Sequence, residues 1–270
     1  MILDWDDAYA NRPYIPDGEG YAAQWAAAAA DFRSKASNAR LDLPYGERAR
    51  ERLDLFYPEG KPKGLLVFVH GGYWMMFDKS VWSHLAAGAL ANGWAVALPA
   101  YPLAPQARIR EISVSVAAAI ELACQQVAGP LCLAGHSAGG HLVARMACQD
   151  SPLPDALRER LQRVMSISGL HDLRSLLRTS MNTTWQMDKE EAVAESPALH
   201  EPLERVQVIC WAGAIERPEF LRQNDLLVNI WTGLGADIQG YHAPDRHHFD
   251  VIAELTQGDS PLVKTLLGLV

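Results

Sequence analysis

The residues best suited to chemistry in this 270-residue chain lie in the segment 135–139, Gly-His-Ser-Ala-Gly. A Gly-x-Ser-x-Gly pattern places a serine at a sharp turn from a strand into a helix, where the flanking glycines let neighbouring backbone pass closely. An apolar run, 131–134, precedes the segment, and a helical stretch, 138–148, follows it. In that context a glycine-serine loop without chemistry is the less favoured interpretation. We predict that Ser137 is a nucleophile whose hydroxyl stands at the positive end of a helix.

A second glycine-containing segment, 70–74 (His-Gly-Gly-Tyr-Trp), directly follows the apolar run 65–69. Acyl transfer passes through a tetrahedral oxyanion, which needs fixed N–H donors aimed at one point. We expect the backbone amides of Gly72, Tyr73 and Ala138 to form this oxyanion hole, and Gly71 is an alternative to either of the first two. A tight turn that uses glycine only for its positive φ is the other interpretation. The serine motif further along the chain favours the oxyanion hole.

A serine hydroxyl is a poor nucleophile unless a base lies close to it. Where a serine occupies this kind of turn, the acid and then the histidine follow it in the chain. The histidines after the serine are His141, His171, His200, His242, His247 and His248. We predict that His248, in a loop after the last expected strand, is the base, with His247 as the second choice. His141 comes one helical turn after Ser137 and is expected to be structural, and a surface turn with two adjacent histidines is the alternative to a catalytic pair.

The acid should follow a strand that lies between the serine and the histidine in the chain. The apolar run 206–211 fits that strand, and the loop after it contains Glu216 and Glu219. Glu216 is the predicted carboxylate that orients the imidazole and stabilises its charged form. Glu219 is expected in the first turn of the next helix, with Pro218 near the helix start, where a carboxylate interacts favourably with the helix dipole without taking part in catalysis.

These residues need a scaffold, and short apolar runs alternate with helical stretches along most of the chain. This alternation predicts an α/β fold with a mostly parallel sheet and helices on both faces. Strands are expected at 52–57 (half-buried), 65–69, 94–98, 131–134, 163–167, 206–211 and 238–241. Helices are expected at 21–35, 81–91, 109–127 and 138–148.

We expect one domain, 1–270, because the sequence contains no repeat, linker or low-complexity tail. An N-terminal helical extension, 1–50, should precede the sheet, and a cap-like helical insertion, 168–203, should lie over one edge of it. Trp185 in this insertion, and the segment 73–76 (Tyr-Trp-Met-Met), are candidates for the wall of a cleft that accepts an aromatic group.

Composition excludes several classes of partner. The chain has 24 basic and 32 acidic residues, a net charge of −8, and no cluster of Lys and Arg, which argues against nucleic acid or an anionic membrane surface. No apolar run approaches the roughly 18 to 20 residues of a membrane span, and the acidic start is unlike a signal peptide. The cysteines have neither paired nor metal-ligand spacing; they are Cys124, Cys132, Cys148 and Cys210. We expect a cytoplasmic protein that acts on a small molecule and needs no metal or organic cofactor.

The motifs together resemble those of the α/β-hydrolases and, more narrowly, of the kynurenine formamidase (arylformamidase) family, over nearly the whole chain. The resemblance rests on the segments 70–74, 135–139, 196–197 (Ser-Pro), 216–223 (Glu-Arg-Pro-Glu-Phe-Leu-Arg-Gln) and 247–252 (His-His-Phe-Asp-Val-Ile). It implies an α/β-hydrolase fold with Ser137, Glu216 and His248 as a catalytic triad. It further implies hydrolysis of an N-formyl arylamine, with N-formylkynurenine as the type substrate and a formyl-serine intermediate. A homodimer is implied by the family resemblance alone.

Two departures keep other functions open. The matching acid in this family is often Asp, whereas this chain has Glu216, whose longer side chain requires a shifted loop. The segment 101–105 (Tyr-Pro-Leu-Ala-Pro) also resembles the esterases related to hormone-sensitive lipase. A carboxylesterase or thioesterase that uses the same triad is therefore the alternative enzyme. A hydrolase fold that only binds a ligand is a third possibility, but the presence of serine, carboxylate and histidine together favours an enzyme.

Overall fold

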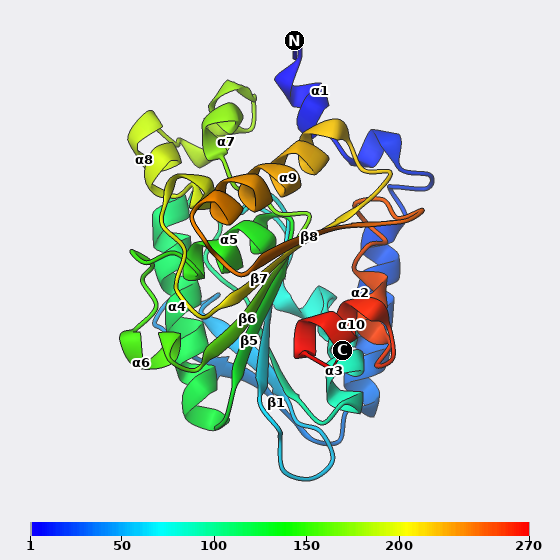
Figure 1. The fold of residues 1–270 in the computed structure, drawn as a ribbon. Coiled ribbons are helices and arrows are strands. Elements are labelled where there is room, and N and C mark those ends of the chain that lie inside the picture. The colour runs from blue at the N-terminus through cyan, green and yellow to red at the C-terminus, as the bar shows by residue number, and fades with distance from the viewer. Residues whose placement is uncertain (1, 270) are drawn as a thin grey trace.

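The computed structural model describes residues 2–269. Within these residues, eight strands form one sheet (Figure 1). The order across the sheet is β1-β2-β4-β3-β5-β6-β7-β8. The strands are β1 (Ala39–Pro44), β2 (Arg52–Phe56), β3 (Leu65–Val69), β4 (Ala95–Pro99), β5 (Leu131–His136), β6 (Leu161–Ile167), β7 (Gln207–Gly213) and β8 (Ile238–Ala243). β2 runs antiparallel to both of its neighbours, and β3 to β8 pair in parallel. The predicted mostly parallel sheet is confirmed.

Helices cover both faces of this sheet (Figure 1). On one face lie α4 (Ile109–Gln126), α5 (Ala138–Met146) and α9 (Pro218–Gly233). On the other face lie α2 (Tyr21–Lys35), α3 (Ala87–Ala91) and α10 (Pro261–Leu267). None of the helices in residues 2–269 is long and apolar enough to cross a membrane.

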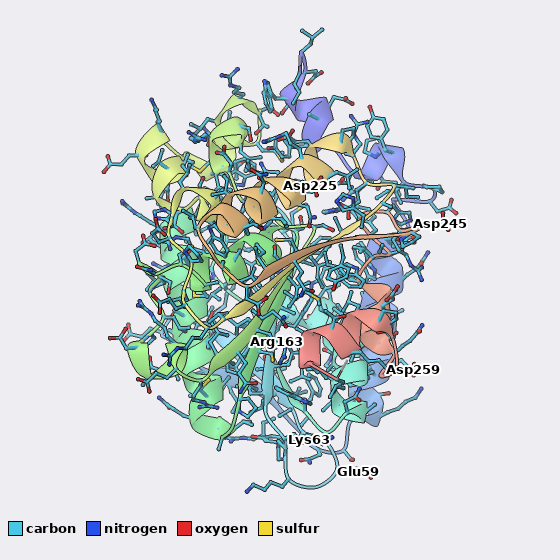
Figure 2. The ribbon with its side chains drawn as sticks, viewed as in Figure 1. Glu59, Lys63, Arg163, Asp225, Asp245 and Asp259 are labelled. Atoms are coloured by element: carbon cyan, nitrogen blue, oxygen red, sulfur yellow. The ribbon has the colours of Figure 1, made fainter. Side chains whose placement is uncertain are left out.

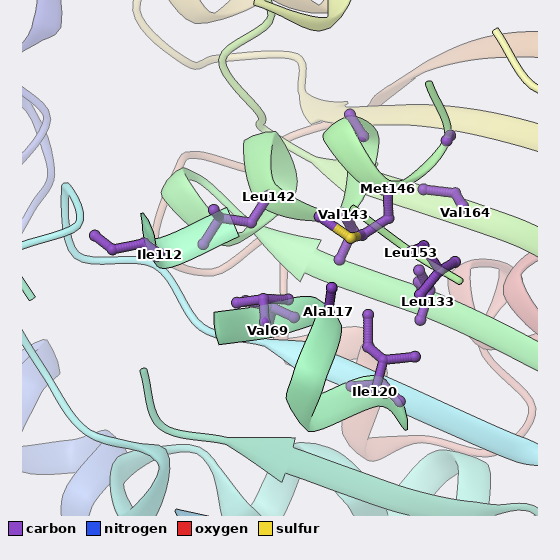
Figure 3. Close-up of a cluster of buried hydrophobic side chains, with 14 of the residues drawn as sticks. Val69, Ile112, Ala117, Ile120, Leu133, Leu142, Val143, Met146, Leu153 and Val164 are labelled. Atoms are coloured by element: carbon purple, nitrogen blue, oxygen red, sulfur yellow. The ribbon is translucent and has the colours of Figure 1, made fainter. Parts of the chain in front are cut away.

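The core consists of two apolar layers, one on each side of the sheet. Along β3 the side chains alternate: Leu65, Val67 and Val69 face one layer, and Leu66 and Phe68 face the other. This is why β3 is apolar at every position, as expected for a strand covered on both faces. Figure 3 shows part of the first layer, with side chains of the strands packed against α4 and α5, among them Val69, Leu133, Val164, Ile112, Ile120, Leu142 and Val143.

The expected helical extension 1–50 differs from the structure at its end. It contains α1 (Trp5–Tyr9), η1 (Arg12–Tyr14) and α2, but it also contains the edge strand β1. The side chains of β1 are mostly exposed, so no buried face marks this strand in the sequence. Backbone pairing with β2 holds it in the sheet.

Two further expectations need correction. The predicted helix 81–91 consists of two 3₁₀ turns, η2 (Lys79–Val81) and η3 (Ser83–Ala86), followed by the short α3. Over so few residues the apolar spacing of a 3₁₀ turn resembles that of an α-helix, so the sequence does not separate them.

β2 was expected to be half-buried, yet Asp54 is only 1% exposed. The Lys79 ammonium lies 2.7 Å from this carboxylate and compensates its burial.

Residues 168–203, between β6 and β7, form η4 (Leu173–Arg178), α7 (Asn182–Trp185), α8 (Lys189–Ala194) and η5 (Pro197–Leu199). In Figure 1 this segment stands beyond α4 and α5, beside α9. The loops that leave the carboxyl ends of the parallel strands open at the same end of the sheet. Figure 2 shows Asp245, after β8, at this end, and Lys63, before β3, at the opposite end.

Candidate active site

Four loops at the carboxyl edge of the sheet carry the predicted site residues. Ser137 lies between β5 and α5, and Tyr73 lies in the loop after β3. Glu216 lies between β7 and α9, and His248 follows β8. Because β3, β5, β6, β7 and β8 are consecutive in the sheet, these loops are neighbours in space although they are far apart in the chain.

Ser137 occupies a strained turn. Its φ of 56° and ψ of −116° belong to neither strand nor helix, and a non-glycine residue with positive φ is held there only by its surroundings. The turn closes tightly, since a Cβ on Gly135 would lie 2.2 Å from the carbonyl oxygen of Gly139. The Ser137 amide donates to the carbonyl of Ile167 at 2.8 Å. Strand, turn and helix together hold the serine side chain at the start of α5.

In the loop after β3, hydrogen bonds to the carbonyl oxygens of Gly71 and Gly72 fix the orientation of two peptide planes. His70 Nδ1 donates to the Gly71 carbonyl at 2.7 Å, and the amides of Met75 and Met76 donate to the Gly72 carbonyl at 3.0 and 2.9 Å. In a trans peptide the N–H points opposite to the carbonyl. The amides of Gly72 and Tyr73 therefore have fixed directions, and a φ of 114° at Gly72 allows this turn.

Within residues 2–269, the amides of Gly72, Tyr73 and Ala138 donate to no protein acceptor. Ala138 is the first residue of α5, where an amide has no partner within the helix. Three fixed, unused donors are what a developing oxyanion requires. The Gly71 amide also lacks a protein acceptor, so the structure does not remove it as an alternative.

Glu216 and His248 form a direct acid–base pair. His248 Nδ1 lies 2.6 Å from Glu216 Oε2, and both side chains are buried. Glu216 Oε1 accepts the Gly213 amide at 2.7 Å and the Ser168 hydroxyl at 2.5 Å. A carboxylate only accepts hydrogen bonds, so Nδ1 carries the proton and Nε2 of the imidazole is left with its lone pair. The Ser168 contact was missed because nothing in the sequence links this serine to Glu216.

Ser137 and His248 line the same cavity, but no hydrogen bond joins the serine hydroxyl to the imidazole in the part of the chain that the structure describes. Such contacts are often loose without substrate and tighten during the reaction. The His248 ring is held from two sides, with its centroid 4.4 Å from that of Phe220 and 4.7 Å from that of His136. The imidazole is therefore fixed in orientation by packing as well as by Glu216.

His136, the residue before the serine, contacts the candidate base His248. Its Nε2 donates to the backbone carbonyl of His248 at 2.8 Å. Burial, and then the proximity of His248, lower the pKa of His136 far below its usual value. His136 therefore remains neutral beside the candidate base.

The cavity beside Ser137 has a volume of about 620 Å³. Its walls include aromatic and methionine side chains together with residues from the N-terminal segment. Besides Ser137 and His248, the lining residues include Asp6, Tyr9, Asn11, Arg12, Glu19, Trp25, Tyr73, Met75, Met76, Phe77, Trp82, Met181 and Phe249. The sequence predicted the contribution of Tyr73, Met75 and Met76 but missed the N-terminal wall, because no local pattern links residues 6–25 to Ser137.

Two predicted wall residues lie elsewhere. Trp74 is fully buried, and its indole N–H donates to His141 Nδ1 at 3.2 Å. Trp185 is also buried, and its indole N–H donates to the Tyr73 carbonyl at 2.7 Å. Neither tryptophan lines the cavity: Trp74, a residue of the candidate oxyanion loop, anchors the loop to His141, and Trp185 bonds to the loop at Tyr73. His141 is buried in the core, as expected for a structural histidine.

The alternatives to the predicted base and acid have other partners. His247 Nε2 lies 3.1 Å from the Tyr21 hydroxyl, and His247 Nδ1 accepts the backbone amides of Phe249 and Asp250. Glu219 lies in the first turn of α9, where it pairs with Arg222. Residues 2–269 contain no group of three His, Cys, Asp or Glu side chains with the arrangement of a metal site.

The Glu216→Gln variant should lower kcat/KM by about 10⁴-fold, by analogy with neutralised acids in other triads. The amide cannot stabilise a charged imidazole and favours the wrong tautomer. Glu219→Gln removes a carboxylate from the same loop region and should cost at least 100-fold less. Both variants should be compared with the parent protein in ester and formamide assays. A greater loss in Glu219→Gln would contradict the assignment of the acid.

Buried histidines should make the protein less stable in acid. Burial lowers the pKa of His70 and His171 to about 4 and that of His141 to about 3. In the unfolded chain a histidine has a pKa of about 6.5. Between these values the unfolded chain binds protons that the folded chain does not, so the free energy of unfolding falls as the pH decreases, by about 2 kcal/mol for each histidine between pH 7 and pH 5. Urea midpoints measured at pH 7, 6 and 5 test this, and an unchanged midpoint would contradict it.

Comparisons with known proteins agree with this architecture. A family described as the alpha/beta hydrolase fold matches residues 66–215. Kynurenine formamidase of Danio rerio is 27% identical over 85% of this chain and 81% of its own length, and that of Drosophila melanogaster is 26% identical over 84% and 80%.

Solved structures extend the comparison to the whole chain. A crystal structure from a Silicibacter species, for which a thioesterase activity has been proposed, is 50% identical over 99% of both chains, with a TM-score of 0.94. Esterase B of Lactobacillus Rhamnosis, at 17% identity over 93% of this chain and 92% of its own, shares the fold with a TM-score of 0.68. Since the family match covers more than half of the chain, the protein belongs to the α/β-hydrolase family.

Proposed function

We propose that this protein is a serine hydrolase that cleaves N-formyl arylamines to formate and the free amine. The observation that carries the proposal is the Glu216–His248 pair, 2.6 Å apart, whose histidine lines the same cavity as Ser137. The aromatic and methionine side chains of that cavity suit an aryl leaving group. The kynurenine formamidase relatives, which match 85% of the chain, support the formamide as the bond that is cleaved.

The proposed reaction has two halves. Ser137 Oγ attacks the formyl carbon while His248 Nε2 takes its proton, and the amides of Gly72, Tyr73 and Ala138 bind the oxyanion. The charged imidazole then gives this proton to the departing arylamine nitrogen, and the C–N bond breaks. Water, deprotonated by His248, attacks the formyl-serine; formate leaves, and the imidazolium returns the proton to Ser137 Oγ. Glu216 accepts the hydrogen bond from the Nδ1–H of His248 throughout and stabilises the imidazolium.

A carboxylesterase or thioesterase acting on small acyl groups is the second candidate. One observation favours it: the Silicibacter structure, at 50% identity, comes with a proposed thioesterase activity. All three reactions use the same acyl-serine chemistry, and they differ in the group that leaves. The shape of the cavity, not the candidate triad, must therefore decide between them.

Steady-state kinetics test the proposal directly. We expect kcat/KM for N-formylkynurenine to exceed that for its N-acetyl analogue by more than about 100-fold, because the formyl group is smaller at the reacting carbon. p-Nitrophenyl acetate and an acetyl thioester serve as the competing substrates. An ester or thioester preference of several orders of magnitude would assign the protein to the second candidate. Absence of covalent labelling of Ser137 by a fluorophosphonate would instead indicate a fold that only binds its ligand.

A further inference from the structure

The segment 216–223 holds buried polar side chains that the proposed reaction does not use. Glu219 is 4% exposed and accepts two N–H groups of Arg222, at 2.5 and 2.8 Å. A third donor to this carboxylate comes from the other end of the chain: the Tyr9 hydroxyl donates to Glu219 at 2.8 Å. Gln223 Nε2 donates to the same hydroxyl at 3.0 Å. The start of α9 is therefore the docking site of Tyr9, and Figure 1 shows α1 beside this end of α9.

A second anchor joins the N-terminal segment to the residue next to the candidate acid. Arg217 Nη2 donates to the Asp7 carbonyl at 3.0 Å and to the Asp7 carboxylate at 2.5 Å. The Arg217 guanidinium also lies 3.6 Å from the centroid of the Tyr14 ring. These contacts fix the backbone around Asp7 and Tyr14 against the loop that carries Glu216.

The same segment holds the candidate oxyanion loop. The Tyr73 hydroxyl donates to the Tyr9 carbonyl at 2.7 Å and accepts Asn11 Nδ2 at 3.2 Å. Tyr9 and Asn11 are 0% and 4% exposed, so water competes little for these bonds. The amide of Tyr73 is a candidate oxyanion donor, and the side chain of the same residue is bonded to the N-terminal segment.

The loop of the candidate base is the third contact. The Tyr21 hydroxyl lies 3.1 Å from Nε2 of His247, the neighbour of His248. The Phe249 ring packs between Tyr21 and Trp25, with centroid distances of 5.5 and 5.3 Å. Residues 7–25 therefore touch all three loops that carry the oxyanion donors, the acid and the base, and they also line the cavity.

We infer that residues 7–25, the N-terminal clamp, are a positioning element of the active site that holds the oxyanion loop in register with the acid–base pair. Tyr9 in the clamp and Tyr73 in the oxyanion loop are the central positioning residues, since the Tyr9 hydroxyl donates to Glu219 of α9 and the Tyr9 carbonyl accepts the Tyr73 hydroxyl. Oxyanion donors act only when they are fixed at the right place, and a displacement of about 1 Å can cost about 100-fold in rate. The inference rests on the proposed role of Ser137, Glu216 and His248.

Two conservative variants, Tyr9→Phe and Tyr73→Phe, remove the hydroxyl groups and keep the rings. Tyr241→Phe is the matched control, because among residues 2–269 the Tyr241 hydroxyl bonds only to exposed Gln239 on β8. For both clamp variants we expect kcat for p-nitrophenyl acetate, and the rate of fluorophosphonate labelling, to fall by about 10- to 100-fold, with KM changed less than about 3-fold. The control should keep all three values within about 2-fold of the parent protein.

Hydrogen exchange gives a readout that does not depend on activity. The amides of Met75 and Met76, which are bonded to the Gly72 carbonyl, should exchange at least about 10-fold faster in Tyr9→Phe and Tyr73→Phe than in Tyr241→Phe, at temperatures well below unfolding. Unchanged exchange of this loop would overturn the clamp whether or not the protein hydrolyses any substrate. Unchanged kcat and labelling in an active protein would also overturn it. A parent protein that shows no turnover and no labelling, but faster exchange in the two variants, would instead reject the proposed function.

Discussion

Replacement of Ser137 by alanine should reduce hydrolysis by about 10⁶-fold, to near the background rate, as removal of a serine nucleophile does in other hydrolases. No acyl-enzyme can form without the hydroxyl, and what remains is the contribution of the oxyanion donors and of substrate binding. Alanine tolerates the strained turn as well as serine does, and the Ser137 hydroxyl forms no hydrogen bond that stabilises the fold within residues 2–269. The variant should therefore unfold at nearly the same temperature as the parent protein.

The measurement for Ser137 combines turnover with covalent labelling. A fluorophosphonate should label the parent protein on Ser137 and leave Ser137→Ala unlabelled. Ser151→Ala is a suitable control, because Ser151 is buried, has no hydrogen-bond partner for its hydroxyl in the described chain, and lies outside the cavity lining. More than about 1% residual activity in Ser137→Ala would exceed what binding and oxyanion donors alone provide, and would contradict the nucleophile assignment.

Replacement of His248 by alanine should have a comparable effect, a loss of about 10⁵- to 10⁶-fold in kcat/KM. In the proposed reaction His248 accepts the proton of Ser137 and donates it to the leaving amine, so both halves of that reaction depend on it. The truncation also leaves a space beside Glu216 Oε2 that an added imidazole molecule can occupy. We expect exogenous imidazole to restore a measurable part of the activity of His248→Ala but none of that of Ser137→Ala.

The neighbouring His247 provides the comparison for this prediction. His247 contacts Tyr21 and two backbone amides, so His247→Asn should slow the reaction through loop position alone, by no more than about 10-fold. Assays of both variants over pH 5 to 9, with and without imidazole, separate the two roles. A larger loss in His247→Asn, or imidazole rescue of that variant, would show that the base was assigned to the wrong histidine.

The strands of this fold were predictable because most of them are buried on both faces. Such strands are apolar at consecutive positions, as β3 is, and they are followed by helices with an apolar side. The expected helix 21–35 coincides with α2, whose Trp25 and Phe32, seven residues apart, pack against the core on one side of the helix. β1 was not predictable because it buries little, and 3₁₀ turns in place of the helix 81–91 were not predictable because both structures space apolar residues alike.

The candidate site was partly predictable for a different reason. Ser137, Glu216 and His248 each follow a strand in a parallel sheet, and the carboxyl ends of such strands meet at one edge. Local motifs and chain order were therefore enough to name them. Ser168 and Tyr9 carry no local signal, because each acts through a partner that is distant in the chain, Glu216 for Ser168 and Glu219 for Tyr9.

The sequence by itself determined the alternation of strands and helices, the hydrolase motifs and the residues that occupy the loops after β3, β5, β7 and β8. These properties depend on local spacing and burial, which the order of residues records directly. Only the tertiary structure decided which side chains fix these loops and close the cavity. The N-terminal clamp, the Trp185 bond to Tyr73 and the Ser168 bond to Glu216 join residues 48 to 226 positions apart. Such contacts depend on how the folded layers meet, and no periodicity along the chain encodes them.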